Sequence, residues 1–533
     1  MRNLDAIIKA YDVRGTYPDQ LDEDLAHEVG AAFVRVLGIS AAEGGPGAVV
    51  VAHDMRPSGP SLVASFAEGV REQGCEVILI GLASTDGLYF ASGHLDLPGA
   101  MFTASHNPAQ YNGIKLCRQG AAPVGQDSGL RAIKEMIGAG IPDGPGPLGE
   151  VREDDLLAAY AAYLRGLVDI SGSRPLRVVV DAGNGMGGFT VPAVLGTGAG
   201  LPALPLDIDP LYFELDGTFP NHEANPIEPA NLRDLQDRVR ATGADLGLAF
   251  DGDADRCFVV DERGEIVNPS TLTALIAARE LAKSPGSVII HNLITSKAVP
   301  EVVLENGGVP VRTRVGHSFI KATMAETNAV FGGEHSGHFY FRDFWRADSG
   351  MLAALHTLAA LGETAEGTTL SSLLSSYDRY AQSGEINTEV LDQAAVTAAI
   401  KAEFGGREGV ELDELDGLTV TGDTWWFNVR PSNTEPLLRL NVEADDESQM
   451  TRLRDEVLTM MRSGGMPDTP SAPLGIPDAL WDVLACPCPQ HAPVAPDLAT
   501  GSIVCTRCRT SFEVRDGAPG MLLDEAVAGP QGL

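Results

Sequence analysis

Short runs of branched apolar residues, each closed by a polar residue and a turn, most constrain how this chain can fold. Residues 48–52 read Ala-Val-Val-Val-Ala and end at His53-Asp54, and the same pattern returns at 178–181 and 288–291. Such runs are typical of buried strands in α/β domains, where the polar strand ends face a cleft. The sequence therefore predicts three related α/β domains with mixed sheets, each presenting its strand ends to a cleft.

The first run is followed by a helical pattern and then by a second strand. We expect Ser61 to be the N-cap of a helix that reaches Gln73, with Gly74 ending it, and a strand at residues 76–80. This alternation supports the α/β assignment.

Composition marks the domain boundaries in a chain of 533 residues, which is too long for a single core. The segment 138–149 is rich in Gly and Pro, the composition shifts near 245–255 and 375–390, and 463–477 is a Gly/Pro/Ser hinge. We predict α/β domains at 1–148, 149–248 and 249–378, a fourth α+β domain at 379–463, a linker at 464–477 and a small β-rich tail at 478–533.

The overall charge excludes some classes of partner. A formal net charge of −35 repels nucleic acid and anionic membranes, and the sequence shows neither an export signal nor an 18-residue apolar run. Cys75, Cys117 and Cys257 are widely spaced and are expected to be reduced structural thiols. We therefore expect a cytoplasmic protein with no nucleic-acid or membrane partner. Any phosphate-binding site in it must be locally basic.

Three aspartates alternate in Asp251-Gly-Asp253-Ala-Asp255, directly after the apolar run 246–250. Carboxylates at this spacing on a loop at a strand end can converge on Mg²⁺, which takes about six oxygen ligands. A solvated acidic turn and a weak Ca²⁺ loop are the alternatives. An EF-hand would place its twelfth ligand at Glu262, but no flanking helices are indicated. We favour a catalytic metal site.

Ser105 lies between the apolar run 100–102 and the turn-forming Asn107-Pro108. Taken alone, this serine would be an ordinary turn residue. Beside a three-aspartate site it becomes a candidate nucleophile, whose phosphorylated form would supply a metal ligand. Lys115 could exchange a proton or neutralise a phosphate, the alternative being a solvated surface lysine.

Two further loops carry groups that suit a sugar phosphate. Arg430 can bind phosphate bidentately, and the hydroxyls of the following Ser432 and Thr434 add donors. In Gly333-Glu-His-Ser-Gly-His338, Glu334 and Ser336 could bind sugar hydroxyls. Read alone, the first loop could also be a turn with a surface arginine.

Residues 183–188 fit the G-x-G-x-x-G pattern, with Asp207 and Asp209 about 20 residues on. This is a formal match to a dinucleotide-binding turn and leaves a nucleotide-dependent oxidoreductase as an alternative. A tight strand-to-helix turn is the preferred interpretation, because nothing else in the chain supplies hydride chemistry. A non-catalytic sugar-phosphate-binding regulator is a second alternative.

The segments 103–108, 251–256, 333–338 and 430–436 resemble, in order, the four signature loops of the α-D-phosphohexomutases, and the resemblance covers about residues 5–463. It implies four domains around one cleft and interconversion of mannose 1-phosphate and mannose 6-phosphate, and of glucose phosphates as well. The reaction would pass through a phosphoserine and a hexose 1,6-bisphosphate, with Mg²⁺ as cofactor.

The same resemblance assigns residues to roles. The implied catalytic residues are Ser105, His106, Lys115, Arg256 and His317. The implied Mg²⁺ ligands are Ser105, Asp251, Asp253 and Asp255. The implied substrate-binding residues are Tyr11, Arg14, Glu334, Ser336, His338, Arg430, Ser432, Asn433 and Thr434.

The third loop is similar to the mannose/glucose branch of that family, with two departures. His335 stands where methionine is common, and the lysine that relatives often carry near position 293 is absent, Leu293 being there and Lys297 being the nearest lysine.

The tail carries a separate motif. Cys486, Cys488, Cys505 and Cys508 fall within 23 residues and resemble a small zinc-ribbon-like family that includes methyltransferase activators. Four thiolates could bind Zn²⁺, although the first pair is C-x-C instead of C-x-x-C, and a metal-free miniature β-domain is the alternative. All four signature loops precede the tail, so we expect it to serve stability or binding of a protein partner.

Overall fold

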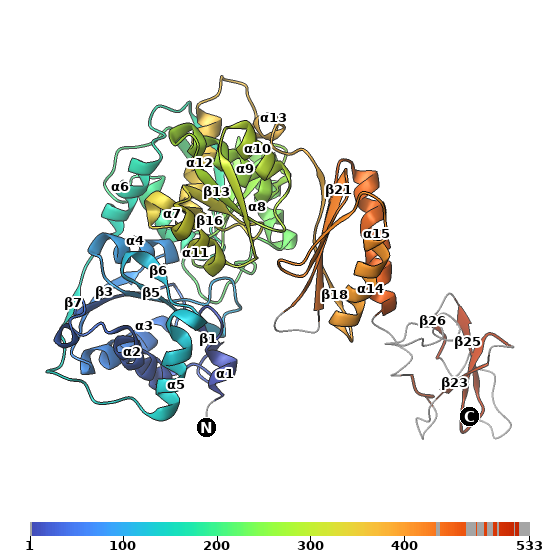
Figure 1. Cartoon of the computed structure of the whole chain (residues 1–533), viewed down its shortest axis with the longest axis horizontal. Coiled ribbons are helices and arrows are strands. Elements are labelled where there is room, and N and C mark those ends of the chain that lie inside the picture. The colour runs from blue at the N-terminus through green and yellow to red at the C-terminus, as the bar shows by residue number, and fades with distance from the viewer. Residues whose placement is uncertain are drawn as a thin grey trace. The chain divides into compact units, whose positions relative to one another are not determined.

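The computed structural model describes residues 3–432, 437–464, 476, 484–487, 494–497, 500–515 and 518–521. The chain divides into two compact units. The first contains Met1–Gly384, Asp413–Asn428 and Asn441–Thr451, and the second contains Glu385–Leu412, Val429–Leu440 and Arg452–Leu533. Figure 1 shows their elements.

The first sheet combines parallel and antiparallel pairs in the order β1-β5-β4-β2-β3-β7, with β6 paired to β5. Strands β2, β3, β4 and β7 are parallel, and β1 and β5 join antiparallel. The strands are β1 (Val13–Thr16), β2 (Ala48–His53), β3 (Glu76–Leu82), β4 (Gly99–Phe102), β5 (Tyr111–Arg118), β6 (Ala122–Pro123) and β7 (Val151–Glu153). The helices of this region are α1 (Leu4–Ile7), α2 (Glu23–Leu37), α3 (Gly59–Glu72), α4 (Thr85–Leu95) and α5 (Arg131–Ala139).

Helix α3 begins earlier than the sequence predicted. It runs from Gly59, with Ser58 in the N-cap position and Pro60 in its first turn, so the expectation that Ser61 is the N-cap was wrong. Proline presets a helical φ angle and is favoured at the first helical position. The Ser61 hydroxyl instead lies in the first turn and donates to the Ser58 carbonyl at 3.2 Å.

The second sheet has the order β12-β11-β10-β8-β9. Its strands are β8 (Leu176–Asp181), β9 (Leu206–Leu211), β10 (Leu246–Phe250), β11 (Cys257–Asp261) and β12 (Ile266–Val267), and the helices nearby in sequence are α6 (Leu157–Leu167), α7 (Gly187–Val194) and α8 (Arg233–Thr242). Strands β10 and β11 form an antiparallel hairpin. The predicted boundary at residue 248 lies inside β10, so this sheet continues beyond it.

The third sheet has the order β14-β13-β15-β16-β17, again with parallel and antiparallel pairs. Its strands are β13 (Val288–Asn292), β14 (Val309–Thr313), β15 (Phe331–Gly333), β16 (Phe339–Phe341) and β17 (Ala347–Asp348). The helices are α9 (Pro269–Lys283), α10 (Ala298–Glu305), α11 (His317–Thr327), α12 (Gly350–Gly362) and α13 (Leu370–Leu374).

The fourth sheet has the order β18-β22-β21-β20-β19, and a small antiparallel sheet of order β23-β24-β25-β26 follows in the tail. The elements are β18 (Ala381–Glu389), α14 (Gln393–Gly405), β19 (Glu411–Asp413), β20 (Leu418–Thr421), β21 (Trp425–Pro431), β22 (Leu437–Ala444), α15 (Glu447–Gly464), β23 (Val494–Asp497), β24 (Ser502–Cys505), β25 (Ser511–Arg515) and β26 (Ala518–Pro519). Three mixed-sheet α/β domains, an α+β domain and a β-rich tail confirm the predicted fold class.

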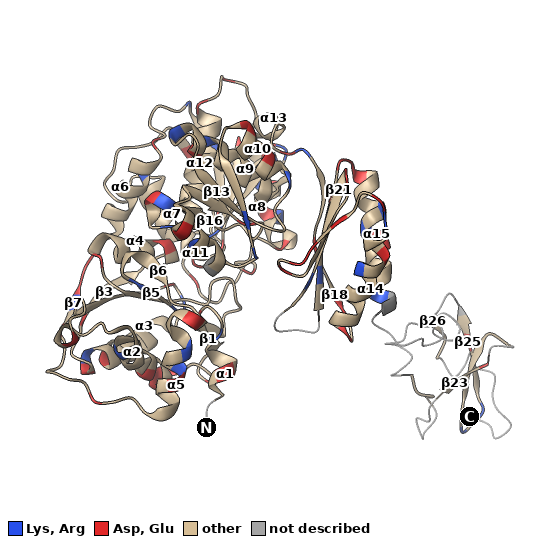
Figure 2. Ribbon diagram, viewed as in Figure 1, with Lys and Arg blue, Asp and Glu red and all other residues tan. Residues whose placement is uncertain are grey.

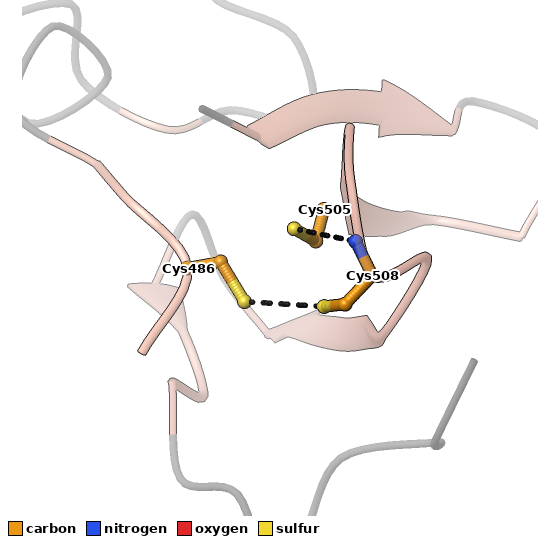
Figure 3. Close-up of side chains that lie close together, drawn as sticks. All are labelled: Cys486, Cys505 and Cys508. Atoms are coloured by element: carbon orange, nitrogen blue, oxygen red, sulfur yellow. Dashed lines mark hydrogen bonds between the residues drawn. The ribbon is translucent and has the colours of Figure 1, made fainter. Parts of the chain in front are cut away.

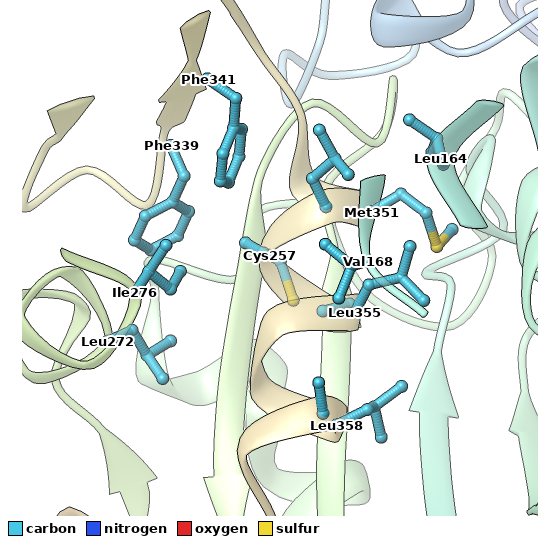
Figure 4. Close-up of a cluster of buried hydrophobic side chains, with 14 of the residues drawn as sticks. Leu164, Val168, Cys257, Leu272, Ile276, Phe339, Phe341, Met351, Leu355 and Leu358 are labelled. Carbon is cyan, nitrogen blue, oxygen red and sulfur yellow. The ribbon is translucent and has the colours of Figure 1, made fainter. Parts of the chain in front are cut away.

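One hydrophobic cluster contains residues from each of the three domains that are built on the first three sheets. It includes Tyr89 and Phe90 from α4, Leu164 from α6, and Phe339 from β16. Figure 4 shows Met351 of α12 beside Leu164, and Cys257 of β11 next to the same helix. Because close-packed cores resist deformation, this shared core holds the three domains as one platform.

Acidic positions occur throughout the described residues and alternate with basic ones along α15 (Figure 2). Within those residues, one segment, Glu23–Glu43, is long and apolar enough to cross a membrane by length and composition. The Leu25, Val29 and Phe33 side chains of its helix α2 are buried in the core, which is the arrangement of an internal helix.

Candidate active site

The loop after β4 presents Ser105 in a constrained conformation. Ser105 has a φ angle of 50°, which side-chain-bearing residues rarely adopt, and its amide donates to the Thr103 hydroxyl at 2.9 Å. Beneath it, the fully buried Arg56 guanidinium donates to the carbonyls of Ser105 at 2.9 Å and Asn107 at 2.7 Å. Residues held in such conformations occur where the surroundings fix them, commonly at functional sites.

The three predicted metal ligands converge on one point. Asp251, Asp253 and Asp255 are buried, and one carboxylate oxygen from each lies within 4.8 Å of the others. The connection from β10 to β11 turns sharply at Ala254, whose φ angle is 58°. Ser105 joins this cluster, because its hydroxyl donates to Asp251 Oδ2 at 2.9 Å.

Two cations balance the three carboxylates. Lys115 Nζ lies 2.7 Å from both Asp253 Oδ2 and Asp255 Oδ2, and Arg256 Nη2 lies 2.8 Å from Asp251 Oδ2. Burial raises the pKa of Asp251 to about 8, and repulsion from the other two aspartates adds to this effect against the attraction of Arg256. For Asp253, burial acts in the same direction but Lys115 outweighs it, so its pKa is lowered.

The donor set fits Mg²⁺. All the converging ligand atoms are oxygens, and Asp253 Oδ1 and Asp255 Oδ1 are buried without a hydrogen-bond partner among the described residues. Mg²⁺ prefers hard oxygen ligands and keeps positions for a phosphate oxygen and water. Asp251, Asp253, Asp255 and the Ser105 oxygen would hold it.

His106 lies between the serine and Arg256. Its Nδ1 is 3.1 Å from Ser105 Oγ and 2.6 Å from Arg256 Nη2. Burial lowers the pKa of His106, and repulsion from Arg256 and Arg14 lowers it further. The ring is therefore neutral, and Nδ1 accepts a hydrogen bond from Arg256.

A cavity of about 310 Å³ opens in front of Ser105. Its wall combines predicted site residues with six that the sequence did not single out. The predicted ones are Tyr11, Arg14, Ser105, His106, Lys115, Asp255, Arg256 and His338, and the additional ones are Asp12, Tyr89, Leu116, Pro123, Lys321 and Asp348. All of them belong to the first unit, so one compact body builds the cavity.

The third loop joins the metal loop directly. Arg256 and His338 form an isolated antiparallel β-bridge, and His338 Nε2 lies 3.7 Å from Asp255 Oδ1. The Ser336 hydroxyl is 2.9 Å from His338 Nδ1. His338, which the resemblance assigns to substrate binding, lies on the cavity wall.

Glu334 occupies a buried position where three donors meet. Its carboxylate accepts from the Tyr340 hydroxyl at 2.6 Å, the Gly316 amide at 3.1 Å and the Asn292 amide at 3.3 Å. Glu334 thus ties the third loop to the turn that precedes α11. His317 begins that helix, and its side chain lies outside the described residues.

Lys297, the lysine nearest to position 293, contacts Asp445 and Tyr380 and is not among the residues that line the cavity. Lys297 Nζ lies 3.3 Å from Asp445 Oδ1 and 4.2 Å from the centre of the Tyr380 ring, while Leu293 is buried. Lys321, like Lys115, reaches the cavity, and it is paired with Asp348 at 2.7 Å.

The fourth loop is described in part. Arg430 Nη2 donates to Glu385 Oε2 at 3.2 Å, and the Ser432 amide donates to the Leu437 carbonyl at 2.8 Å. Asn433 and Thr434 lie outside the described residues.

The sequence missed Arg56, Tyr89, Lys321 and Asp348. Arg56 follows the polar end of β2, which is a weak signal that could have been used. Lys321 lies over the Tyr89 ring at 4.3 Å, a contact between α11 and α4 that no local pattern announces. Asp348 Oδ2 lies 4.0 Å from His338 Nε2.

The G-x-G-x-x-G segment is a turn between β8 and α7, as preferred. The Met186 amide donates to the Gly252 carbonyl at 2.9 Å, and a Cβ on Gly185 would lie 2.7 Å from that oxygen. These glycines let the turn pack against the metal loop. Asp207 and Asp209 pair with Arg177 and Arg238 on the neighbouring elements.

The tail brings three of its four cysteines together (Figure 3). Ligand sulfurs of Cys486, Cys505 and Cys508 lie within 4.8 Å of one another, while Cys488 lies outside the described residues. The amides of Arg507 and Cys508 donate to Cys505 Sγ at 3.4 and 3.3 Å. Hydrogen bonding with Thr510 lowers the pKa of Cys508 to about 6, which favours the thiolate that a zinc ion needs.

Comparison with known proteins identifies families whose domains together contain this site. The chain matches four domain families described as phosphoglucomutase/phosphomannomutase: domain I at residues 5–140, domain II at 158–264, domain III at 268–380 and the C-terminal domain at 385–460. The chain belongs to the phosphoglucomutase/phosphomannomutase family. Residues 478–517 match a family described as Trm112p-like protein.

Relatives align with almost all of residues 5–460, the mutase region, which contains the four matched domains. A protein of Xanthomonas campestris pv. campestris named "Phosphohexose mutases" is 40% identical over 458 residues, which is 86% of this chain and 99% of that protein. An Escherichia coli protein named phosphomannomutase is 38% identical over 462 residues, covering 85% and 98%. The crystal structure of a phosphoglucomutase/phosphomannomutase family protein from Burkholderia thailandensis aligns with a TM-score of 0.77 at 33% identity, covering 87% and 98%.

Proposed function

We propose that this phosphohexomutase interconverts mannose 1-phosphate and mannose 6-phosphate, and acts on glucose phosphates as well. The observation that carries the proposal is the Ser105 hydroxyl, held 2.9 Å from Asp251 in a buried three-carboxylate cluster at the floor of a cavity. Relatives named phosphomannomutase support the mannose assignment.

In the proposed reaction, phospho-Ser105 gives its phosphoryl group to the free sugar hydroxyl. The bond from phosphorus to Ser105 Oγ breaks as the bond to the sugar oxygen forms. The sugar hydroxyl loses its proton and Ser105 Oγ takes one up, which yields a hexose 1,6-bisphosphate and the free serine hydroxyl. The sugar reorients, and Ser105 Oγ takes back the other phosphoryl group. Mg²⁺ bound by the aspartates would neutralise charge on the transferring group.

The cavity residues have distinct proposed roles. Lys115 and Arg256 neutralise the phosphoryl group, and Lys115, as an ammonium, can also supply a proton to a leaving oxygen. Attraction to Asp253 and Asp255 overcomes the effect of burial and raises the pKa of Lys115. His106 Nδ1 lies within hydrogen-bonding distance of the Ser105 hydroxyl. His317, the first residue of α11, is also assigned to catalysis.

Substrate binding uses groups from several loops. We assign Tyr11, Arg14, Glu334, Ser336 and His338 to the sugar and its proximal phosphate. Arg430, Ser432, Asn433 and Thr434 are assigned to the distal phosphate. The chain as a whole repels anions, because its net charge is −35. A site that binds phosphate therefore needs a local positive charge, which Arg430 would supply.

For the tail we propose a Zn²⁺ site formed by Cys486, Cys488, Cys505 and Cys508, on a domain that serves stability or a protein partner. The match to the Trm112p-like family and the three converging thiols support this. We also propose a cytoplasmic location, in which the thiols of Cys75, Cys117 and Cys257 stay reduced.

A coupled mutase assay tests the proposal. Purified chain with Mg²⁺ and glucose 1,6-bisphosphate should convert mannose 1-phosphate and glucose 1-phosphate to the 6-phosphates. Ser105→Ala should abolish both activities, while Ser61→Ala, an exposed serine of the same domain, should retain them. Absence of turnover by the unaltered chain with either sugar would contradict the proposed function.

A further inference from the structure

A second cavity adjoins the catalytic one and is not used by the proposed reaction. It has a volume of about 590 Å³ and shares Tyr11, Pro123 and Lys321 with the catalytic cavity. Its remaining wall comes from the segment 120–128, from α11 and from the turn at Trp345-Arg346. Both cavities lie within the first unit.

Arg346 gives this side cavity an uncompensated positive charge. Within the described part of the chain, its guanidinium makes no hydrogen bond or ion pair, and its Nε is buried. Two carboxylates nearby are already engaged: Asp127 with Arg131 at 2.6 Å and Asp348 with Lys321 at 2.7 Å. In a chain of net charge −35, a cation left unpaired in a cavity wall is a ready partner for an anion.

The turn that carries Arg346 is fixed from two sides. Trp345 and Arg346 both have left-handed backbones, with φ angles of 53° and 58°. The Trp345 indole stacks on Tyr163 at 5.1 Å and packs over Gly93, where a Cβ would lie 2.2 Å from the ring. Consecutive strained residues persist only where their surroundings hold them, so Arg346 is pre-organised on the wall.

The rest of the wall indicates the kind of molecule that would bind. Trp345, Phe319 and Tyr11 contribute aromatic surface, and Gln126 and Ser128 contribute polar groups. Ligand pockets of this kind combine apolar walls with a few polar groups that fix orientation. A phosphorylated sugar presents a charged end for the arginine, C–H groups for the rings and hydroxyls for the polar side chains.

We propose that this side cavity binds a second hexose phosphate molecule, with its phosphate on Arg346. The shared wall favours this ligand class, because molecules that reach Ser105 also reach Tyr11 and Lys321. The choice of a hexose phosphate rests on the proposed function, whereas the anion site at Arg346 rests on the cavity alone.

Equilibrium dialysis with radiolabelled mannose 6-phosphate and Mg²⁺ tests this inference on the full chain. The Ser105→Ala variant prevents turnover and should bind two molecules per chain. Adding Arg346→Ala should leave one. Adding Arg342→Ala should leave two, because Arg342 lies on the same connection but is paired with Asp343 at 2.9 Å. The remaining site in the Arg346→Ala protein reports that it is folded.

Four results would overturn the proposal. One is a single site in the Ser105→Ala chain, and another is two unaltered sites after Arg346→Ala. The third is loss of both sites in Arg346→Ala and Arg346→Gln alike, which would place Arg346 in the fold or the catalytic cavity. The fourth is displacement of the second molecule by GDP at lower concentrations than those at which unlabelled mannose 6-phosphate displaces it. This result would show that the ligand is not a hexose phosphate. Failure of the proposed function is distinguishable, because it appears as absent turnover in the unaltered chain.

Discussion

Two clusters in this chain could each hold a metal ion, and their surroundings differ. The carboxylates of Asp251, Asp253 and Asp255 stand on a loop between two strands of a five-stranded sheet, and Lys115 and Arg256 balance their charge. The thiols of Cys486, Cys505 and Cys508 stand in a described core of five buried residues, of which Cys486 and Cys505 are two. The aspartate cluster belongs to a region with a large hydrophobic core, whereas the cysteines themselves form much of the small core of the tail.

These different surroundings determine what each metal is expected to contribute. The mutase region has a core that spans three domains, so we expect its fold to form without an ion. A domain of the tail's size rarely buries enough apolar area alone and usually needs a metal or disulfides. We therefore expect Mg²⁺ to govern activity without governing the fold, and Zn²⁺ to govern the fold of the tail without governing activity.

The largest expected effect is on the tail. Structural zinc contributes about 10–16 kcal/mol to folding in small zinc peptides, so its removal should unfold residues 478–521. Cys505→Ser should cause loss of stoichiometric zinc and of amide protection in the tail, measured by metal analysis and hydrogen exchange. Cys75→Ser, in the mutase region, should retain the zinc. A tail that stays protected without metal would support the metal-free alternative.

The next largest effect is on catalysis. Asp253→Asn removes a carboxylate that Lys115 and Thr85 contact at 2.7 and 2.6 Å, and turnover should fall about 100- to 1,000-fold, because metal ions stabilise transition-state charge by several kcal/mol. Its melting temperature should stay within a few degrees of the parent. Asp207→Asn, exposed on β9, is the matched control and should change neither quantity. Unfolding of Asp253→Asn would contradict the contrast between the clusters.

A smaller effect is expected from the residue behind His338. Asp348→Asn keeps the shape but weakens the ion pair with Lys321 and the contact with His338, so kcat should fall about 10- to 100-fold, as for other orienting partners. Steady-state kinetics should show kcat falling more than KM rises. Asp343→Asn, exposed five residues earlier, should be neutral. An effect on KM alone would assign Asp348 to substrate binding instead.

The smallest effect is expected from removing the tail altogether. Truncation after residue 465 should leave mutase turnover per active site within a few-fold of the full chain, because every proposed catalytic group precedes it. The coupled assay measures this directly, with circular dichroism as the folding control. A folded truncation that loses several orders of magnitude would show that the tail takes part in catalysis.

The sequence predicted the parts of the site that short motifs carry. The alternation at 251–255 and the serine before Asn-Pro identified the cluster around Ser105, since each motif places its own side chains. The start of α3 was misjudged by three residues, because Pro60 lies in its first turn and Ser58, not Ser61, is the N-cap. Lys321, Tyr89 and Asp348 could not be found, because their contacts join α11, α4 and β17, and such contacts depend on how separate elements pack.

The most direct test of the phosphoserine mechanism is transfer of a labelled phosphoryl group to Ser105. The full chain is incubated with Mg²⁺ and ³²P-labelled glucose 1,6-bisphosphate, digested and mapped. We predict label on Ser105, discharged by adding mannose 1-phosphate and absent from Ser105→Ala. An enzyme that turns over with no label on Ser105, or with the label on another residue, would contradict the phosphoserine mechanism.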